Sequence, residues 1–219
     1  IFGIAGVAGN GQSELMDILV GENTQIDNGE IIFNNQNIET FNPQKRRNLS
    51  IAFVPENRLG HSAVPELTLS ENILLSQFPN NGFSKQGILN NNLIEEQAKK
   101  VIKNFNVVTS GSDAKASSLS GGNLQKFVIG REISSQPKLL IISHPTWGID
   151  AGAEYSIRES LIELSKNGTS IIVLSQDLDE LIEITHRISV IFEGKLSEPL
   201  NTKQVDISKL GLLMGGKNE

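Results

Sequence analysis

The stretch that decides the fold is GVAGNGQSE, Gly6–Glu14, which follows the apolar segment IFGIA at Ile1–Ala5. Its spacing is the G-x-x-x-x-G frame of a phosphate-binding loop, in which the next two positions are normally Lys and Ser or Thr. Here those positions are Gln12 and Ser13. Glycines let backbone N–H groups converge on an anion, and a helix beginning at Ser13 adds its positive end. Because Gln12 carries no positive charge, the loop alone is consistent both with a weakened phosphate site and with a tight strand-to-helix turn.

The rest of the chain alternates apolar runs of strand length with segments of helical spacing, which predicts an α/β fold with a mainly parallel sheet. GEIIFNNQNI predicts an antiparallel hairpin that turns at Asn34 and Asn35, and Asn42-Pro43 begins a short helix through Arg47. Strands are predicted at Ile1–Ala5, Ile51–Val54, Lys138–Ile142, Ser170–Leu174 and Ile188–Phe192. Helices are predicted at Ser13–Val20, Ser70–Ser76 with Ser70 as the N-cap, Asn92–Asn104, Gly121–Ser134, Glu154–Lys166, Asp177–Thr185 and Ile207–Met214.

The composition of the 219 residues fits a packed domain of this kind. Hydrophobic residues make up 38% and charged residues 20%, which favours a folded core over disorder. The formal net charge of −6 argues against a nucleic-acid partner, and the absence of cysteine excludes disulfides and thiolate metal sites. The longest apolar runs are strand-sized, and no signal peptide is visible. Because the chain begins within a predicted strand and without Met, we expect it to be a fragment of a longer polypeptide.

A second glycine motif, SLSGGNLQK at Ser118–Lys126, places Ser120, Gly121 and Gly122 at the predicted start of a helix. There a serine hydroxyl, two closely approachable backbone amides and the positive end of a helix point at one spot. The same residues also describe an ordinary N-cap followed by a glycine turn.

A third motif, LLIISHPTWGID at Leu139–Asp150, is an apolar strand that ends in Ser143 and His144. In nucleoside triphosphatases this strand end carries an Asp near magnesium and a following Glu that polarises the attacking water. Ser143 does not attract a metal ion as a carboxylate does. His144 is either a general base or a partly exposed strand-end histidine without a catalytic role. It shows no metal-ligand spacing with His61 and His186.

In their order and spacing, the three motifs resemble those of ATP-binding cassette (ABC) ATPases over nearly the whole chain. GNGQSEL, FVPENR, LSGGNLQK, HPTWGIDAGA and SQDLDEL further resemble the second, C-terminal cassette of tandem-cassette subunits that energise bacterial importers of simple sugars or nucleosides. The resemblance implies a P-loop NTPase of the ABC type over residues 1–219. Its expected parts are a mainly parallel sheet core, an antiparallel β part and an inserted helical subdomain at about 67–135. An aromatic residue that stacks on adenine in this family is expected before Ile1.

The departures from the family pattern fall on one half-site. The family has Lys, Gln, Asp, Glu and His at the positions of Gln12, Glu56, Ser143, His144 and Gln176, respectively. These positions hold phosphates, magnesium and water, so the resemblance implies that ATP and Mg²⁺ bind weakly and that no catalytic set is intact in cis. Ser13 remains as a weak magnesium contact. The residues implied for nucleotide binding are Gly6, Gly9, Asn10, Gly11, Gln12, Ser13 and Glu14.

The signature, in contrast, is intact. In this family two cassettes dimerise head to tail, and each nucleotide lies between the loop of one and the signature of the other. The resemblance therefore implies donation of the signature to the N-terminal cassette of the same chain or to a second copy. Further implied partners are transmembrane permease subunits and, indirectly, an extracytoplasmic binding protein, which implies a peripheral position on the cytoplasmic face of the inner or plasma membrane. The signature residues are Ser120, Gly121, Gly122, Asn123 and Gln125, with Asp150 in the D-loop.

Two other functions stay open: a non-hydrolysing regulatory module that holds nucleotide, and an independent phosphotransferase with His144 as its base. Glu56-Asn57-Arg58 is either a solvated loop or the place where the family couples to its membrane subunits. Trp147 is expected to pack in the core, although a place at the dimer interface is the alternative. The basic run Lys45-Arg46-Arg47 is expected to form an exposed helix face.

Overall fold

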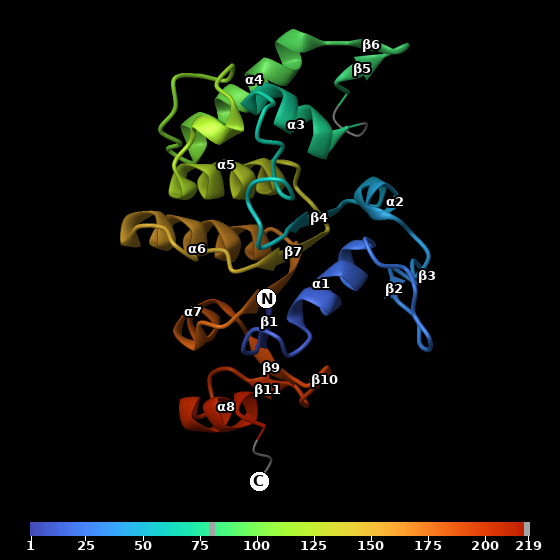
Figure 1. Ribbon diagram of the computed structural model, residues 1–219, viewed down its shortest axis with the longest axis vertical. Coiled ribbons are helices and arrows are strands. Elements are labelled where there is room, and N and C mark those ends of the chain that lie inside the picture. The colour runs from blue at the N-terminus through green and yellow to red at the C-terminus, as the bar shows by residue number, and fades with distance from the viewer. Residues whose placement is uncertain (79–81, 217–219) are drawn as a thin grey trace.

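A seven-stranded sheet passes through the middle of the molecule, as the computed structural model shows for residues 1–78 and 82–216 (Figure 1). The strand order is β10-β9-β1-β8-β7-β4, and β11 also pairs with β9. Strands β9, β1, β8, β7 and β4 run parallel, whereas β10 and β11 are antiparallel to β9. The predicted α/β fold with a mainly parallel sheet and an antiparallel part is therefore confirmed. The bounds of the sheet strands are β1 Phe2–Ala5, β4 Ile51–Val54, β7 Leu139–Ser143, β8 Ser170–Ser175, β9 Arg187–Phe192, β10 Lys195–Leu196 and β11 Leu200–Asn201.

The strand register brings the ends of four strands to one edge of the sheet. Ala5 of β1 lies opposite Ser175 of β8, and Leu174 lies opposite Ser143 of β7. Val54, the last residue of β4, pairs with Ile142 of β7, which is one residue before Ser143. Because these strands are parallel, the segments that follow them all leave the sheet at this edge.

Helices cover both faces of the sheet, with α1 on one face and α5, α6, α7 and α8 on the other (Figure 1). Helices α3, α4 and α5 pack on one another as a helical part that carries the β5–β6 hairpin. No helix in the described part of the chain is both long and apolar enough to span a membrane. The helices are α1 Gln12–Val20, α2 Pro43–Asn48, α3 Leu69–Gln77, α4 Asn91–Asn104, η1 Ala116–Ser118, α5 Gly121–Ser134, α6 Ala151–Lys166, α7 Leu178–Ile184 and α8 Ile207–Met214.

Two short hairpins stand outside the sheet. The predicted hairpin is confirmed as β2 Ile32–Phe33 and β3 Gln36–Asn37, and Asn34 and Asn35 between them have φ angles of 49° and 62°. The hairpin of β5 Ser84–Lys85 and β6 Ile88–Leu89 was not predicted, because strands of two residues are too short to show an alternation of apolar and polar side chains.

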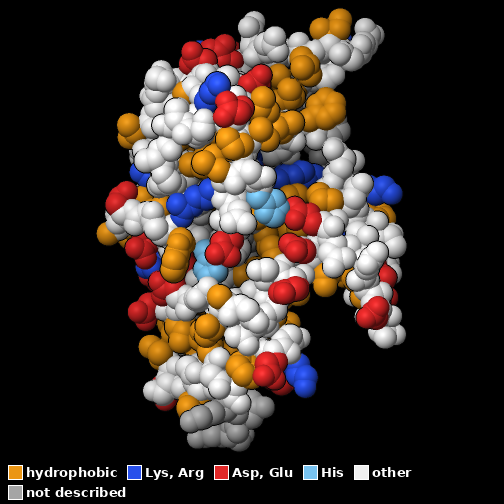
Figure 2. Space-filling model, in the orientation of Figure 1, with side chains coloured by type: hydrophobic (Ala, Val, Ile, Leu, Met, Phe, Trp, Pro, Cys, Tyr) orange, Lys and Arg blue, Asp and Glu red, His pale blue; other side chains and the backbone are white. Residues whose placement is uncertain are grey.

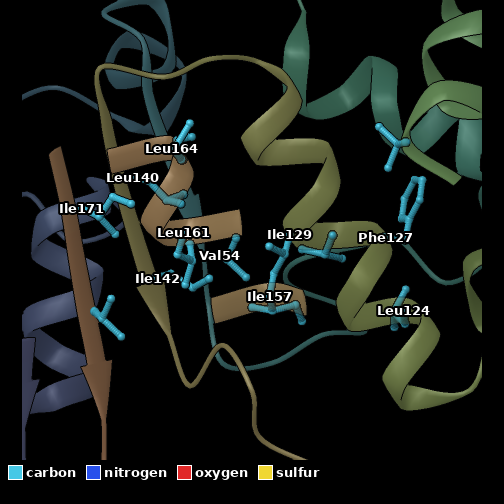
Figure 3. Close-up of a cluster of buried hydrophobic side chains, with 14 of the residues drawn as sticks. Val54, Leu124, Phe127, Ile129, Leu140, Ile142, Ile157, Leu161, Leu164 and Ile171 are labelled. Carbon is cyan, nitrogen blue, oxygen red and sulfur yellow. The ribbon is translucent and has the colours of Figure 1, made fainter. Parts of the chain in front are cut away.

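The main core lies between the sheet and the helices α5 and α6. Figure 3 shows side chains from β4 and β7 in contact with those two helices. Phe127 and Ile157, one from each helix, are almost completely buried there. A second, smaller cluster joins α1 to the opposite face of the sheet through Met16 and Val20. Burial of apolar side chains on both faces fixes the positions of α1 and α5, whose N-termini carry the two glycine motifs.

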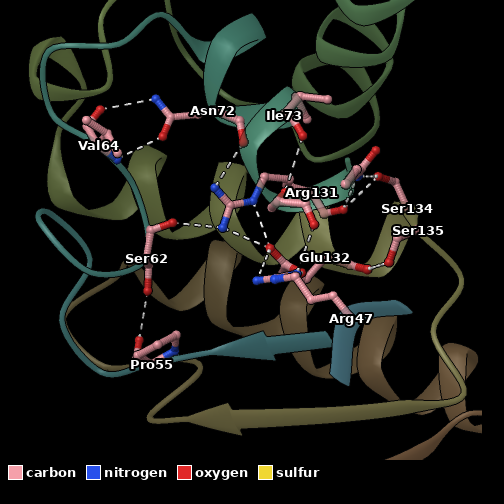
Figure 4. A network of polar contacts seen from close by, with 12 residues as sticks. Arg47, Pro55, Ser62, Val64, Asn72, Ile73, Arg131, Glu132, Ser134 and Ser135 are labelled. Carbon is pink, nitrogen blue, oxygen red and sulfur yellow. Dashed lines mark hydrogen bonds and ion pairs between the residues drawn. The ribbon is translucent and has the colours of Figure 1, made fainter. Parts of the chain in front are cut away.

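A buried ionic network joins the helical part to α2 (Figure 4). Glu132 of α5 is fully buried and pairs with Arg47 of α2 at 2.7 Å and with Arg131 at 2.8 Å. Burial by itself raises the pKa of Glu132, but the two arginines outweigh it and hold that pKa below its usual value. A carboxylate between two guanidinium groups therefore fixes α5 against α2.

Two predictions about local structure are wrong. Helix α3 is capped by Thr68 instead of Ser70, because Thr68 and Glu71 form a reciprocal capping box. The run Lys45–Arg47 is not an exposed face either. Arg46 is completely buried and donates to the carbonyls of Ile18 and Leu19 at the end of α1, at 2.7 and 2.6 Å.

Candidate nucleotide site

The loop between β1 and α1 has the backbone geometry of an anion cradle. Gly9 and Gly11 have φ angles of 84° and 107°, which a residue with a side chain rarely adopts. Gly11 is the N-cap of α1 and supplies no side-chain acceptor, so the first-turn amides of the helix have no cap. These amides and the positive end of α1 suit a phosphate group.

The side chain of Gln12 is turned back into this loop. It is 8% exposed, and its Nε2 donates to the carbonyl of Gly6 at 2.9 Å. The position that carries a lysine in a typical phosphate-binding loop therefore contributes a neutral, internally bonded amide. The nearest charge in the first turn of α1 is the exposed carboxyl group of Glu14, which disfavours an anion.

The loop is also fixed to the turn between β9 and β10. The side-chain oxygen of Asn10 accepts from the backbone N–H of Glu193 at 3.1 Å, and its carbonyl accepts from Gly194 at 2.9 Å. A Cβ atom at Gly6 would lie 2.6 Å from the side chain of Ile191 in β9. Glycine at position 6 is thus needed for close packing of the loop against β9.

The end of β7 brings Ser143 and His144 to the same edge of the sheet. Both are buried, so the prediction that His144 is partly exposed is wrong. Its backbone turns sharply, with a φ angle of 48°, and its ring lies edge-on to Trp147 with 6.0 Å between ring centroids. Burial lowers the pKa of His144, and the nearby Glu56 partly opposes that shift.

Trp147 itself is 65% exposed, so the prediction of core packing is wrong. Its indole extends from the loop after β7, where Gly148 has a φ angle of 62° and the chain turns away from the sheet.

Glu56 follows β4 and is exposed, and Gln176 follows β8 and is half-buried. The structure therefore brings Gln12, Glu56, Ser143, His144 and Gln176 to one edge of the sheet.

Sequence reasoning missed Glu180 of α7, which joins two loops at this edge. Its carboxyl oxygens accept from the hydroxyls of Thr146 and Ser175, each at 2.7 Å. The side chain is buried, and burial raises its pKa despite these hydrogen bonds. The only signal was its place in SQDLDEL, directly after the predicted strand.

The donor set fits a phosphate better than a magnesium ion. No group of three His, Asp or Glu side chains that could hold a metal occurs within residues 1–78 and 82–216. Ser13 is exposed at the first turn of α1 and offers one hydroxyl, whereas Ser143 stands where a carboxylate is needed. Mg²⁺ prefers carboxylate and phosphate oxygens, so this edge suits it poorly.

The signature motif lies at the N-terminus of α5. Ser120 is exposed and caps the helix, because its Oγ accepts from the backbone N–H of Asn123 at 3.4 Å and from its side chain at 3.0 Å. Gly121 is exposed and Gly122 half-buried beside it. Gln125 is buried and donates to the carbonyl of Pro145 at 2.9 Å, so its amide supports the loop after β7 from within the chain.

Asp150 is exposed and caps α6 through the backbone N–H of Ala153 at 3.0 Å, and this hydrogen bond is the main reason for its lowered pKa.

A phosphate-binding loop, a sheet edge with four converging strand ends and a separate helical part with its own glycine tip define an ATP-binding cassette fold. The sequence model of the ABC transporter family matches residues 1–147, and the chain belongs to this family. The fold is also that of a dimeric post-hydrolysis state of the ATP-binding cassette MJ0796 bound to ADP and Pi. The TM-score is 0.79 at 22% identity, over 94% of this chain and 86% of that one.

Two curated relatives are similar along the whole chain. It is 39% identical over 218 residues to the nucleoside import ATP-binding protein NupA of Lactococcus lactis subsp. cremoris. It is 38% identical over 219 residues to the guanosine import ATP-binding protein NupO of Bacillus subtilis. The match covers 100% of this chain and 43% of each relative, so the chain spans less than half their length.

Proposed function

We propose that this chain is the second cassette of a tandem-cassette ATP-binding subunit and serves the import of nucleosides or simple sugars. Its role is to present the signature, Ser120–Gly122, to the ATP site of a partner cassette, while its own loop faces an impaired site. The resemblance of its motifs to such cassettes and its similarity to import ATP-binding proteins support this role. Residues 1–219 then form one nucleotide-binding domain of a longer chain.

The observation that carries the proposal is a difference between the two glycine motifs. At the signature, Ser120 and Gly121 are exposed at a capped helix N-terminus, where a neighbouring molecule can reach them. At the phosphate loop, Gln12 is neutral and bonded to Gly6, and β7 ends in Ser143 instead of a carboxylate. ATP binding at this loop is therefore expected to be weak, and turnover there absent.

A transmembrane permease is the proposed membrane partner, which places the cassette at the cytoplasmic face of the membrane. Figure 2 shows hydrophobic side chains gathered over the helical part, near the top of the view. Exposed apolar residues of this part mark a surface for protein contact. They include Leu75, Phe78, Ile88 and Leu89.

The test is the ATPase activity of the full-length subunit assembled with its permease. Ser120→Arg places a bulky cation at the exposed tip, and we expect it to abolish turnover while the domain stays folded, because loss of the N-cap hydroxyl costs only about 1 kcal/mol. Lys209→Met, an exposed change on α8, is the matched control and is expected to leave turnover unchanged. Unchanged turnover in Ser120→Arg would refute donation of the signature.

Two other functions would give different results in ATP binding and ATP hydrolysis. A purely regulatory module binds a labelled ATP analogue well below millimolar concentration in equilibrium titration, while Ser120→Arg leaves turnover intact. An independent phosphotransferase hydrolyses ATP without a partner and loses this activity in His144→Ala. His144 is buried and burial lowers its pKa, which makes it a weaker base, and no specific observation favours it as the catalytic base.

A further inference from the structure

The loop after β4 is a folded unit and not an open connection. The carbonyl of Arg58 accepts from the backbone N–H of Ala63 at 2.8 Å. The hydroxyl of Ser62 donates to the carbonyl of Pro55 at 3.1 Å, which closes the base of the loop. The backbone of Arg58 is therefore held in a compact turn.

One side of this loop is bonded to the C-terminal half of α5. The carbonyl of Ser62 accepts from Nη2 of Arg131 at 2.8 Å, and Arg131 is nearly fully buried (Figure 4). Arg131 is in turn paired with Glu132 in the ionic network. A buried side chain of α5 therefore holds this side of the loop.

The side chain of Arg58 reaches the other end of α5. Its Nη2 donates to the carbonyl of Trp147 in the loop after β7. A Cβ atom added at Gly121 would lie only 3.1 Å from Nη1, and one added at Gly148 would lie 3.7 Å from Nη2. The guanidinium group thus occupies the space between the signature tip and the Trp147–Gly148 turn.

Burial lowers the pKa of the Arg58 guanidinium. No acidic side chain in the described part of the chain offsets this effect. Its role at this point is therefore not that of an ordinary surface ion pair. Arg58 lies two residues after Glu56 in the sequence. Neither composition nor periodicity distinguishes Arg58 from a solvated loop residue.

We propose that Arg58 is a positioning residue that fixes the signature tip, Ser120–Gly122, against the loop that carries Asp150. This rests on the proposed donation of the tip to a partner cassette. A guanidinium presents several donors in one rigid plane, so it sets the spacing of two loops in a way that a flexible ammonium group does not. Gly121 beside it leaves room for that plane. A displacement of the tip of about 1 Å would lower catalysis at the partner site by up to about a hundredfold.

The experiment compares the full-length subunit with its variants Arg58→Met and Arg58→Lys. The variant Lys209→Met is the control for loss of a charge. Amide hydrogen exchange is followed at residues 119–123 and 146–149. We expect it to accelerate several-fold in both segments in Arg58→Met, less in Arg58→Lys, and not at all in Lys209→Met. In the assembled importer kcat should fall roughly tenfold or more in Arg58→Met, with a smaller change in KM for ATP.

Gly121→Ala tests the same contact from the other side, because its methyl group meets Nη1, and it should accelerate exchange at 146–149 as well. It keeps the test decisive if Arg58→Met does not fold. Unchanged exchange at both segments in the folded variants overturns the proposal. If exchange accelerates and kcat is unchanged, the positioning role of Arg58 stands. The proposed donation of the signature to a partner cassette is then refuted.

Discussion

Gln12 donates its side-chain amide to the carbonyl of Gly6 across 2.9 Å, so a neutral group closes the phosphate loop from within. The backbone around it still has the two left-handed glycines and the uncapped helix start that suit an anion. The loop therefore has the backbone shape of an anion site, and the side chain at position 12 is neutral.

Gln12→Lys should tighten the binding of ATP at this loop. A hydrogen bond to a charged group contributes roughly 1.5–3 kcal/mol, which corresponds to about ten- to a hundredfold tighter binding of ATP. Equilibrium titration with a labelled ATP analogue measures this, and Gln12→Ala is the control that removes the amide without adding charge. Equal affinities of Gln12→Lys and the native chain would show that the missing cation does not limit binding.

Arg46→Met should destabilise the domain by about 3 kcal/mol or more. The guanidinium of Arg46 donates to the last carbonyls of α1 and to Phe41 at 2.9 Å, and its removal leaves these buried acceptors without partners. Denaturant unfolding provides the measurement. Lys45→Met, on the exposed neighbour, should change stability by no more than about 0.5 kcal/mol. Similar losses in the two variants would contradict the assignment of Arg46 as a buried cap of α1.

Glu132→Gln should be among the most destabilising single changes in the helical part. It leaves the charges of Arg47 and Arg131 without their carboxylate, and breaking a buried ion pair in this way costs about 3–5 kcal/mol. The loss should appear as a lower denaturant midpoint with an unchanged m-value. Glu95→Gln, which breaks the exposed pair with Lys99, is the matched control. If Glu132→Gln lowers the unfolding free energy no more than Glu95→Gln does, the buried network contributes little.

Glu180→Gln should change how stability depends on pH. Burial raises the pKa of Glu180, so the folded chain binds this proton more tightly than the unfolded chain does. The stabilisation is fully present below the ordinary value of 4.5 and is lost as pH rises through the raised pKa of the folded state. The unfolding free energy of the variant relative to the native chain should therefore increase with pH over this window and then stay constant.

Unfolding midpoints measured at a series of pH values give this difference, in which the other titrating groups largely cancel. A difference that does not vary with pH would mean that Glu180 has the same proton affinity in both states. Thr146→Val, which removes one of its hydroxyl donors, should raise the pKa further and move the window to higher pH.

Much of the fold was predictable because its signals are local. The helices Gly121–Ser134 and Ile207–Met214 begin and end as predicted, and the turn at Asn34 and Asn35 has the expected left-handed backbone. Apolar periodicity and capping act within a few residues along the chain, so they can be read from the sequence. The order of the glycine motifs likewise indicated a phosphate loop and a separate signature helix.

The environment of single side chains was less predictable, because it depends on residues far away in the sequence. Trp147 was expected in the core and is exposed, whereas His144 and Arg46 are buried. A basic run on a short helix normally faces water, but α1 presents its unbonded carbonyls just where Arg46 lies.

The sequence by itself determined the order of the five parallel strands and of the α-helices, the two glycine motifs and the absence of the usual charges from one of them. Only the tertiary structure decided what fills the space around those motifs. It placed Arg58 between Gly121 and Trp147, and Glu180 between Thr146 and Ser175. The physical reason is that backbone preference and apolar spacing are properties of neighbouring residues, whereas burial and hydrogen-bond partners arise only when distant segments pack together.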